Sequence, residues 1–525
     1  MHIGGSRTLT LRSSRLVMPD RIRGRRHGAA TAAVAVVACL LVGAGCSADE
    51  GKGVATTSTG LAAPKPAPAR PDGPVAELTP IEAAGSPFIG SAVGVDVPDG
   101  YRQTEYIASG EATGYDAPDP LPADGEWTFR PEGSAAYRTR VLVRRPEDPG
   151  AFSGTVVVEW LNVSAGLDAN PEYASFEEEI VRRGDAWVGV SAQLIGVNGG
   201  PVLVPVPGVD AFTGKGLRSI DPVRYGTLDH PGDGYAFDIF TQVARAVRDV
   251  DIAGATVDQM LAAGESQSAI ALTTYYNGVQ PLTRTFDGFF IHSRAFAALP
   301  VVGPGEMADL AGSMAKVPHA VVLRGDLATP ALELQSEADV TGVLRSIEAR
   351  QSDSDTFRLW EVAGTAHADQ HLLGPMADLL DCGSPVNSGP MHLVAKAGYA
   401  ALKTWAAGGE APPTAPRLAT DEAGGATPTQ RRNAAGVGEG GIRTPPVEVP
   451  VEVLSGAPGP NPSLICQLMG STTPIPSEQL ATMYASAAEY QRHFDTAVEA
   501  TVDAGFLLAE DRAAMVAFAS PERLG

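Results

Sequence analysis

Residues 260–269 read MLAAGESQSA, and this short stretch decides how the rest of the chain is interpreted. The mostly apolar residues 257–263 before the turn predict a strand, and residues 269–276 after it predict a helix. Ser266 stands in the turn between them. A Ser in a sharp strand-to-helix turn needs small residues two positions before and after it, and Gly264 and Ser268 supply them. The stretch therefore predicts a hydroxyl presented at the end of a strand.

The chain supplies the partners that such a hydroxyl needs, in the order nucleophile, acid, histidine. His367 follows the expected strand 357–362 and lies in a loop rich in Gly and Ala, and Asp339 and Glu337 precede it. We favour Asp339 as the acid because Ser-x-x-Asp at 336–339 overlays the commoner Gly-x-x-Asp of this position. Glu337 remains the alternative, since alternate residues of an extended segment point to the same side.

These residue types form a complete set for nucleophilic catalysis. Ser266 would attack a carbonyl carbon, the histidine would carry its proton to the leaving group, and the carboxylate would orient the imidazole. The N–H of Gln267, at the start of a helix, is expected to donate to the developing oxyanion. A second donor is expected after the strand 155–161, from the backbone of Asn162 or Val163. A simple strand-end turn is the other interpretation of Asn162.

Other histidines were weighed against His367. His371 lies four residues later, His292 ends an apolar strand and is expected to be buried, and His230 lies in a loop. Neither an H-E-x-x-H motif nor a Cys/His cluster accompanies the pair His367 and His371. The sequence therefore predicts no metal and no cofactor.

From about Val75 onward, β-branched runs alternate with amphipathic stretches. This alternation predicts an α/β fold with a mainly parallel central sheet flanked by helices. The apolar segment 295–316 predicts a small cap insertion, and the C-terminal extension 408–525 is a candidate wall over the site. The expected strands are 139–144, 155–161, 186–192, 257–263, 288–292, 319–323 and 357–362, and the expected helices are 171–183, 233–250, 269–276, 391–406, 477–492 and 494–508.

Several of these segments resemble bacterial alpha/beta hydrolase domain proteins. The segments are EWLNVS (159–164), VSAQ (190–193), GESQS (264–268), RLWEVAGTAH (358–367), NSGP (387–390) and GGIRTP (440–445). The resemblance extends from about Pro74 to the C-terminus. It implies an α/β-hydrolase fold with Ser266 and His367 in the catalytic roles, and it implies no particular substrate.

The N-terminus has the pattern of an export signal. Residues 1–45 carry seven Arg and one Asp, and residues 29–42 form an apolar run shorter than the roughly 20 residues of a membrane-spanning helix. The small residues before Cys46 resemble the lipobox of bacterial lipoproteins, which implies a lipid on the Cys46 thiol. An ordinary signal-peptidase site is the alternative, and Met18 is an alternative start to Met1.

The sequence thus divides into an export signal (1–45), a Pro/Ala-rich linker (46–74) and a hydrolase-like domain (75–525). The linker composition favours an extended tether. The whole chain has a net charge of −22. Because the leader carries +6, the rest of the chain carries −28. This acidity argues against a nucleic-acid partner, because phosphate binding needs a Lys/Arg surface. We expect a protein held at the cell envelope through its N-terminal lipid, or otherwise secreted.

Cys382 and Cys466 are the cysteines that follow Cys46. In an oxidising compartment they predict one disulfide that pins the C-terminal extension onto the core. Closing a loop of this length stabilises the fold by about 4–5 kcal/mol in the chain-entropy model. Two buried free thiols are the alternative.

These expectations lead to three interpretations of function. The favoured one is an exported serine hydrolase, a carboxylesterase acting on small-molecule esters, because ester leaving groups need less acid assistance than amines. A peptidase or amidase would use the same residues. An envelope lipoprotein that uses the fold only for binding is the interpretation without catalysis. The sequence indicates no oligomeric state.

Overall fold

The computed structural model describes residues 70–524 apart from 207–210, 250–255, 317–318 and 424–425. The predictions for the export signal, for Cys46 and for most of the linker concern residues outside this set. The first described residues already contact the folded body, since the Arg245 guanidinium donates hydrogen bonds to the carbonyl oxygens of Pro71 and Pro74. The last residues of the predicted linker, Pro71 and Pro74, therefore contact α5 (Ala236–Asp249) of the folded body.

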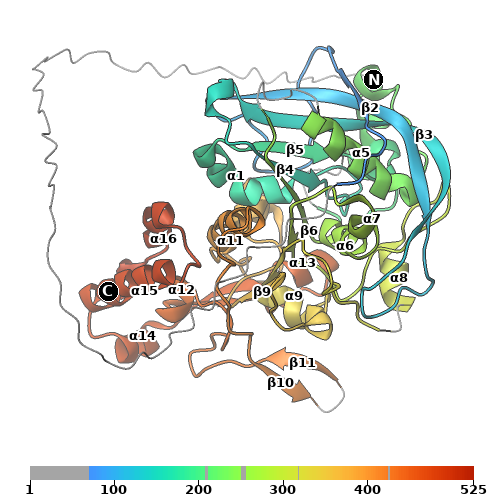
Figure 1. The fold of residues 1–525 in the computed structure, drawn as a ribbon. Helices are drawn as coiled ribbons and strands as arrows, with labels where there is room; N and C mark the ends of the chain where they lie inside the picture. The colour runs from blue at the N-terminus through green and yellow to red at the C-terminus, as the bar shows by residue number, and fades with distance from the viewer. Residues whose placement is uncertain (1–69, 207–210, 250–255, 317–318, 424–425, 525) are drawn as a thin grey trace, which may run out of the picture. The chain divides into compact units, whose positions relative to one another are not determined.

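Nine strands of the described residues form the central sheet (Figure 1). They are β1 (Glu77–Pro80), β2 (Tyr101–Asp116), β3 (Arg130–Pro146), β4 (Thr155–Trp160), β5 (Ala186–Val190), β6 (Gln259–Glu265), β7 (Gly288–His292), β8 (Ala331–Ser336) and β9 (Phe357–Val362). Their order is β1-β2-β3-β5-β4-β6-β7-β8-β9. The six strands from β5 to β9 in this order are parallel, and β1, β2 and β3 add an antiparallel side. The carboxyl ends of the parallel strands therefore share one edge, where ligands bind in such sheets.

Helices cover both faces of this sheet, as Figure 1 shows. Up to residue 406 they are α1 (Pro171–Arg183), α2 (Leu194–Asn198), α3 (Gly216–Ile220), α4 (Pro222–Tyr225), α5 (Ala236–Asp249), α6 (Gln267–Thr274), α7 (Gln280–Thr283), α8 (Leu310–Lys316), α9 (Glu337–Thr341), α10 (Gln370–Leu373) and α11 (Met391–Ala406). In β6, Met260 and Ala262 pack with α5 and α6, whereas Leu261 and Ala263 pack with α1 and α11. A strand covered on both faces needs an apolar run, which explains the composition of β6. The predicted parallel sheet flanked by helices is confirmed.

The C-terminal extension adds a smaller core beside the sheet. Its elements are β10 (Thr420–Ala423), β11 (Ala426–Gln430), α12 (Pro445–Glu448), β12 (Glu452–Ser455), α13 (Leu464–Leu468), β13 (Ser471–Pro474), α14 (Ser477–Met483), α15 (Ala487–Asp503) and α16 (Arg512–Val516). Tyr490, Phe494 and Val498 of α15 are buried in one cluster with Leu393 of α11. The helices α14, α15 and α16 lie grouped together away from β2 and β3 (Figure 1). Because α11 contributes to this cluster, the extension is packed onto the hydrolase-like core.

Four expected elements agree with the structure residue for residue: the helices 171–183 and 391–406 and the strands 288–292 and 357–362. The expected strand 319–323 is wrong. Val321 and Leu323 are buried, but the N–H groups of Val321 and Val322 donate to the loop carbonyls of Phe296 and Ala123. The segment has the apolar composition of a strand without pairing in the sheet, and β8 takes the place next to β7.

The predicted helices at 477–492 and 494–508 have the wrong boundaries. The chain leaves the helical conformation after Met483, and α15 then runs without a break to Asp503. Ser486 begins α15, because its side chain accepts a hydrogen bond from the N–H of Glu489. A Ser three residues before a Glu is a recognised helix start, so the sequence carried this signal.

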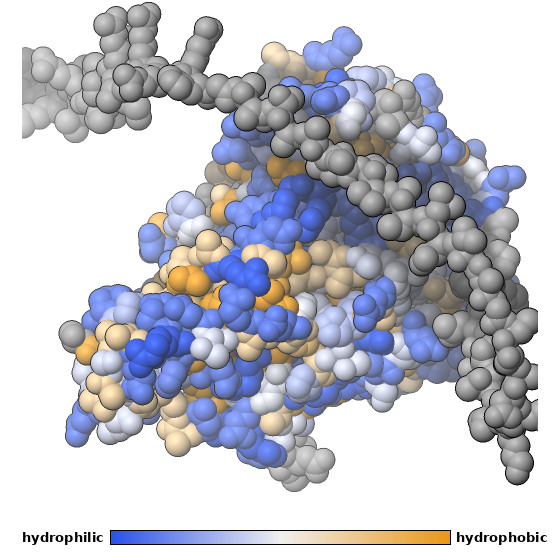
Figure 2. All heavy atoms as spheres, turned by 60° about the vertical axis from the view of Figure 1, so that its left-hand side comes forward, coloured by the Kyte–Doolittle hydropathy of each residue, from blue (hydrophilic) through white to orange (hydrophobic). Residues whose placement is uncertain are grey.

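Figure 2 views the side of the molecule that carries the C-terminal helices. Hydrophilic side chains cover most of this side, and apolar side chains form small groups between them. Over the described part of the chain, no helix combines the length and the apolar character needed to cross a membrane.

Candidate active site

Ser266 occupies the strained turn that the GESQS stretch predicts. Its backbone has φ 61° and ψ −121°, a conformation that side-chain-bearing residues rarely adopt. A Cβ on Gly264 would lie 3.0 Å from the Cβ of Ser268, so both positions must remain small. The N–H of Ser266 donates to the carbonyl oxygen of His292 at 2.9 Å, which ties the turn to the end of β7. Local crowding and one backbone bond thus hold the Ser266 hydroxyl at the carboxyl edge of the sheet.

The carboxyl ends of three parallel strands, β6, β8 and β9, bring the proposed catalytic residues together. Ser266 follows β6, Asp339 lies in α9 directly after β8, and His367 lies in the loop after β9. The Nε2 atom of His367 is 2.8 Å from Oγ of Ser266. Its Nδ1 atom is 2.7 Å from Oδ1 of Asp339. The structure therefore places these three residues in one hydrogen-bonded chain, with the imidazole between the hydroxyl and the carboxylate.

The other oxygen of Asp339 is held by two serines that the sequence analysis did not assign to the site. Oδ2 accepts hydrogen bonds from Oγ of Ser293 at 2.6 Å and from Oγ of Ser336 at 2.7 Å. The N–H of Ser336 donates to the same oxygen at 2.7 Å. Ser336 and Asp339 form a capping box at the start of α9, and the Ser-x-x-Asp spacing is the sequence signal for it. The carboxylate is thereby fixed before it meets the imidazole.

Glu337, the alternative acid, faces a different part of the molecule. Its carboxylate accepts hydrogen bonds from the N–H of Gly364 at 2.8 Å and from the N–H of Gly456 at 2.9 Å. The guanidinium of Arg432 pairs with the same group. Since Arg432 and Gly456 belong to the C-terminal extension, Glu337 joins the extension to the core and makes no hydrogen bond to His367.

Burial and pairing act in opposite directions on the pKa values of Asp339 and His367. Burial raises the pKa of Asp339, but the His367 ring and the hydrogen bonds from the two serines outweigh it and lower the pKa. Burial lowers the pKa of His367, but the Asp339 carboxylate outweighs it and raises the pKa. The pair therefore favours a carboxylate next to an imidazole that accepts a proton readily.

The predicted oxyanion donors have different outcomes. Gln267 is the first residue of α6, where a backbone N–H has no acceptor within the helix, so its N–H suits an oxyanion at Ser266. The N–H of Asn162 instead donates to the carbonyl oxygen of Ala169 at 2.9 Å. The Asn162 N–H is therefore already engaged in a backbone pair, which contradicts its assignment as the second donor. Val163, the other residue named for this role, remains the candidate.

A cavity of about 160 Å³ opens beside Ser266 and His367. Its wall is mostly apolar and comes from five separate segments: residues 90–93, six residues between 162 and 174, residues 204 and 206, residues 372, 373 and 376, and residues 468 and 469. The expected cap 295–316 contributes no residue to this lining, and its residues 298 and 300–303 border a separate cavity of about 410 Å³. The sequence therefore misplaced the cap, because the cover over Ser266 comes from the loops and from α13.

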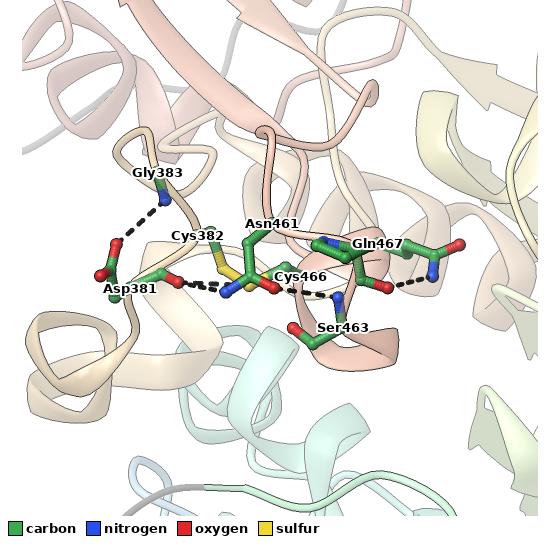
Figure 3. Close-up of a disulfide and its surroundings, with 8 residues drawn as sticks. Asp381, Cys382, Gly383, Asn461, Ser463, Cys466 and Gln467 are labelled. Carbon is green, nitrogen blue, oxygen red and sulfur yellow. Dashed lines mark hydrogen bonds between the residues drawn. A yellow bond between two sulfur atoms is a disulfide. The ribbon is translucent and has the colours of Figure 1, made fainter.

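The predicted disulfide between Cys382 and Cys466 is present, with the two Cα atoms 5.4 Å apart (Figure 3). Cys466 lies in α13, which ends at Leu468 in the cavity wall. Beside the disulfide, the side-chain amide of Asn461 donates to the carbonyl oxygen of Asp381 at 2.7 Å (Figure 3). These two links join the extension to the chain that follows α10. The disulfide therefore holds together two of the five segments of the wall.

The remaining histidines lie outside the hydrogen-bonded chain. His371 stacks on His392 with ring centroids 3.7 Å apart, and His230 is buried with Nε2 at 2.8 Å from the carbonyl oxygen of Ala192. His292 is buried, as expected, with its Nδ1 at 3.4 Å from the carboxylate of Glu172. Among the described residues, no three His, Cys, Asp or Glu side chains are grouped so that they could hold a metal ion.

Comparison with known proteins agrees with the fold. The sequence profile of the alpha/beta hydrolase domain family matches residues 71–517. No protein of curated function matches the chain by sequence. The similar solved structures include a glucuronoyl esterase from Teredinibacter turnerae, with 14% identity, a TM-score of 0.22, and 43% of this chain and 47% of that chain covered. This chain thus spans about half the length of that esterase.

For two further solved structures, the match with this chain covers most of their own length. An α/β serine hydrolase without a lid from Xanthomonas campestris has 14% identity and a TM-score of 0.24, with 51% of this chain and 90% of that chain covered. A fungal esterase from Rhizomucor miehei has 10% identity and a TM-score of 0.28, with 57% of this chain and 85% of that chain covered. At these identities and scores, the similarities carry no argument about a substrate.

Proposed function

The chain belongs to the alpha/beta hydrolase domain family, and on that basis we propose that it is a serine hydrolase that cleaves carboxylic esters through an acyl-enzyme. The observation that carries this proposal is the chain of hydrogen bonds from Ser266 through His367 to Asp339 beside an apolar cavity. A hydroxyl needs a base within hydrogen-bond reach before it can attack, and 2.8 Å meets that requirement.

The proposed reaction has two half-reactions. Oγ of Ser266 attacks the ester carbonyl carbon while Nε2 of His367 takes the hydroxyl proton, and the oxyanion accepts a hydrogen bond from the N–H of Gln267. The bond to the alkoxy oxygen then breaks, and His367 gives that oxygen the proton. Water repeats the sequence on the acyl-enzyme, releases the acid and restores the Ser266 hydroxyl. Throughout, Asp339 stabilises the imidazolium and holds its orientation.

Labelling with a fluorophosphonate probe tests the proposal, because the probe forms a covalent bond only with an activated Ser hydroxyl. We expect the wild-type protein to be labelled and Ser266→Ala to remain unlabelled. The two proteins should have the same circular-dichroism spectrum, which shows that the variant is folded. The matched control is Ser268→Ala, two residues away, which should retain labelling. Absence of labelling in folded wild-type protein would contradict the assignment of a serine hydrolase.

Paired substrates test the choice of esters over amides. The wild-type protein should cleave the nitrophenyl ester of butyrate much faster than the nitroanilide of the same acid, because the amine leaving group needs more acid assistance. Equal rates on the two substrates would instead support the peptidase or amidase interpretation.

The location of the protein is a second part of the proposal. We propose export across the cytoplasmic membrane and attachment through a lipid on Cys46, on the basis of the basic, apolar and small-residue sequence that precedes it. The intact mass of protein extracted from membranes should begin at Cys46 and include a diacylglycerol. A mass that begins after another residue and has no lipid addition would contradict lipidation.

A further inference from the structure

Glu265, the residue directly before Ser266, has no part in the proposed proton transfers. It is the last residue of β6 and lines the cavity beside Ser266 and His367. Alternation along β6 places it on the same face as Leu261 and Ala263, the face covered by α1 and α11. Only 4% of its surface is exposed. A buried acidic residue therefore lines the cavity, next to the nucleophile.

The surroundings of Glu265 leave its carboxyl group without a hydrogen-bond donor. Its backbone carbonyl accepts a hydrogen bond from the Asn162 side chain at 3.0 Å, which fixes the main chain. Within the described chain, however, no group donates to its carboxyl oxygens. The neighbours on this face are His292, paired with it in the β6–β7 register, and the buried Glu172 of α1. A carboxyl that lines a cavity and accepts no hydrogen bond from the protein can accept one from a molecule that enters the cavity.

The rest of the cavity narrows the choice of ligand. Among the lining residues, Glu265 and His367 are the two ionisable ones; Ser91, Asn162 and Ser164 add neutral polar groups, and the rest of the wall is mostly aliphatic. A small apolar substrate with one hydrogen-bond donor would fit such a lining. An ammonium group beside Glu265 would repel His367, which becomes an imidazolium during each proton transfer. A hydroxyl group donates a hydrogen bond without this repulsion.

The ionisation of Glu265 agrees with this use. Burial raises the pKa of its carboxyl to about 7, against the partial opposition of His292 and His367. At and above neutral pH a large part of the protein therefore carries a carboxylate there, and an ionised acceptor forms the stronger hydrogen bonds.

We propose that Glu265 is a specificity-determining residue that accepts a hydrogen bond from a hydroxyl group of the ester substrate, within a few bonds of the scissile carbonyl. This inference rests on the proposed serine hydrolase function. The hydroxyl can belong to the acyl group or to the alcohol group of the ester, because both flank the carbonyl that Ser266 attacks.

Pairs of esters that differ only by a hydroxyl in place of a methyl group test this proposal. For the acyl side, the pair is the nitrophenyl esters of β-hydroxybutyrate and isovalerate. For the alcohol side, the pair is hydroxyethyl butyrate and propyl butyrate. We expect kcat/KM of the wild-type protein to favour the hydroxylated member of at least one pair by about 10- to 100-fold, the range of one hydrogen bond to a charged group. The pair that responds identifies the side.

Two variants connect the preference to Glu265. Glu265→Leu removes the acceptor, so the preference should fall to about onefold. Glu265→Gln keeps a weaker neutral acceptor and should retain part of the preference. Met376→Leu, on the aliphatic wall, is the matched control and should change both members of a pair by the same factor. Should the Leu variant fail to fold, the Gln variant alone decides.

A wild-type protein with no preference in either pair would overturn the proposal, as would a preference that both Glu265 variants keep unchanged. These results are distinct from failure of the proposed function. A protein that reacts with the fluorophosphonate through Ser266 and cleaves both members of each pair equally is a serine hydrolase without the Glu265 contact. A protein that does not react at Ser266 fails the proposed function itself.

Discussion

The proposed catalytic edge and the cavity wall of this protein are built in different ways. The proposed catalytic edge lies at the carboxyl ends of β6, β8 and β9, where Ser266 directly follows β6, Asp339 lies in α9 after β8, and His367 lies in the loop after β9. The cavity wall consists of five loop and helix segments between residues 90 and 469, with a disulfide next to two of them. The proposed chemistry therefore depends on side-chain hydrogen bonds between residues that follow strands of one sheet, whereas the shape of the cavity depends on contacts between distant segments.

The largest expected effect tests the catalytic edge. Ser266→Ala should lower kcat on a nitrophenyl ester by about 10⁶-fold, because it removes the hydroxyl that lies within hydrogen-bond reach of His367 and would form the acyl-enzyme. The thermal denaturation curve should stay close to that of the wild type, since Ala fits any space that Ser occupies. Substantial turnover by the folded variant would show that the catalytic edge lies elsewhere.

The next effect separates the two carboxylates near the edge. Asp339→Asn should lower kcat by about 10⁴-fold, because the imidazole loses the group that sets its tautomer. Since the Asp339 carboxylate raises the pKa of His367, the acid limb of kcat/KM should move to lower pH in any residual activity.

The matched control for that change is Glu337→Gln, two residues earlier. Its carboxylate binds Arg432 and two backbone N–H groups of other segments, so the substitution should lower stability and leave kcat near the wild-type value. If Glu337→Gln abolished turnover while Asp339→Asn retained it, the acid would have to be reassigned.

The difference between edge and wall also explains how far the sequence alone could lead. Ser266, His367 and Asp339 could be identified because each lies in a short motif at the end of a strand, and parallel strands place such ends together. The Ser336 contact with Asp339 follows from a local capping pattern. The sheet and most of its helices follow from apolar periodicity, which is also a local property.

Contacts between distant segments could not be predicted in this way. Ser293 approaches Asp339 only because β7 lies next to β8, and the sequence does not give that strand order. The engagement of the Asn162 N–H depends on a turn that brings back Ala169. Val321 and Leu323 have the composition of a strand, yet they pack among loops. In each case the outcome depends on which segment lies alongside, and hydrophobic pattern does not encode that.

Loss of the disulfide should affect the wall while sparing the edge. The double variant Cys382→Ser/Cys466→Ser should lower the free energy of unfolding by about 2–5 kcal/mol, because the unfolded chain regains the freedom of an 84-residue loop. It should raise KM on a butyrate ester more than it lowers kcat, since α13 supplies residues 468 and 469 of the cavity wall. Urea denaturation and steady-state kinetics measure the two effects.

Labelling by the fluorophosphonate probe provides the control for the disulfide variant. The hydrogen bonds from Ser266 to His367 and from His367 to Asp339 do not involve the wall, so labelling should persist. If the double variant had the same free energy of unfolding and the same KM as the wild type, the cavity wall would not depend on the disulfide.

The smallest expected effect concerns Glu265, where the edge meets the wall. Its pKa is about 7 in the folded protein against an ordinary value of 4.5, so the folded state holds its proton more tightly than the unfolded state. The free energy of unfolding of the wild-type protein therefore falls by about 3 kcal/mol in all as the pH rises from about 4.5 to about 7. The Gln side chain in Glu265→Gln does not ionise, so this variant should not show that decrease. Its stability advantage in urea denaturation should be near zero at low pH, grow across this window and stay constant above it, whereas Glu478→Gln, at an exposed position on α14, should show no such growth. Parallel curves of unfolding free energy against pH for the wild type and Glu265→Gln would mean that the carboxyl is solvated in the folded protein. Glu265 would then not differ in its ionisation from an exposed carboxyl.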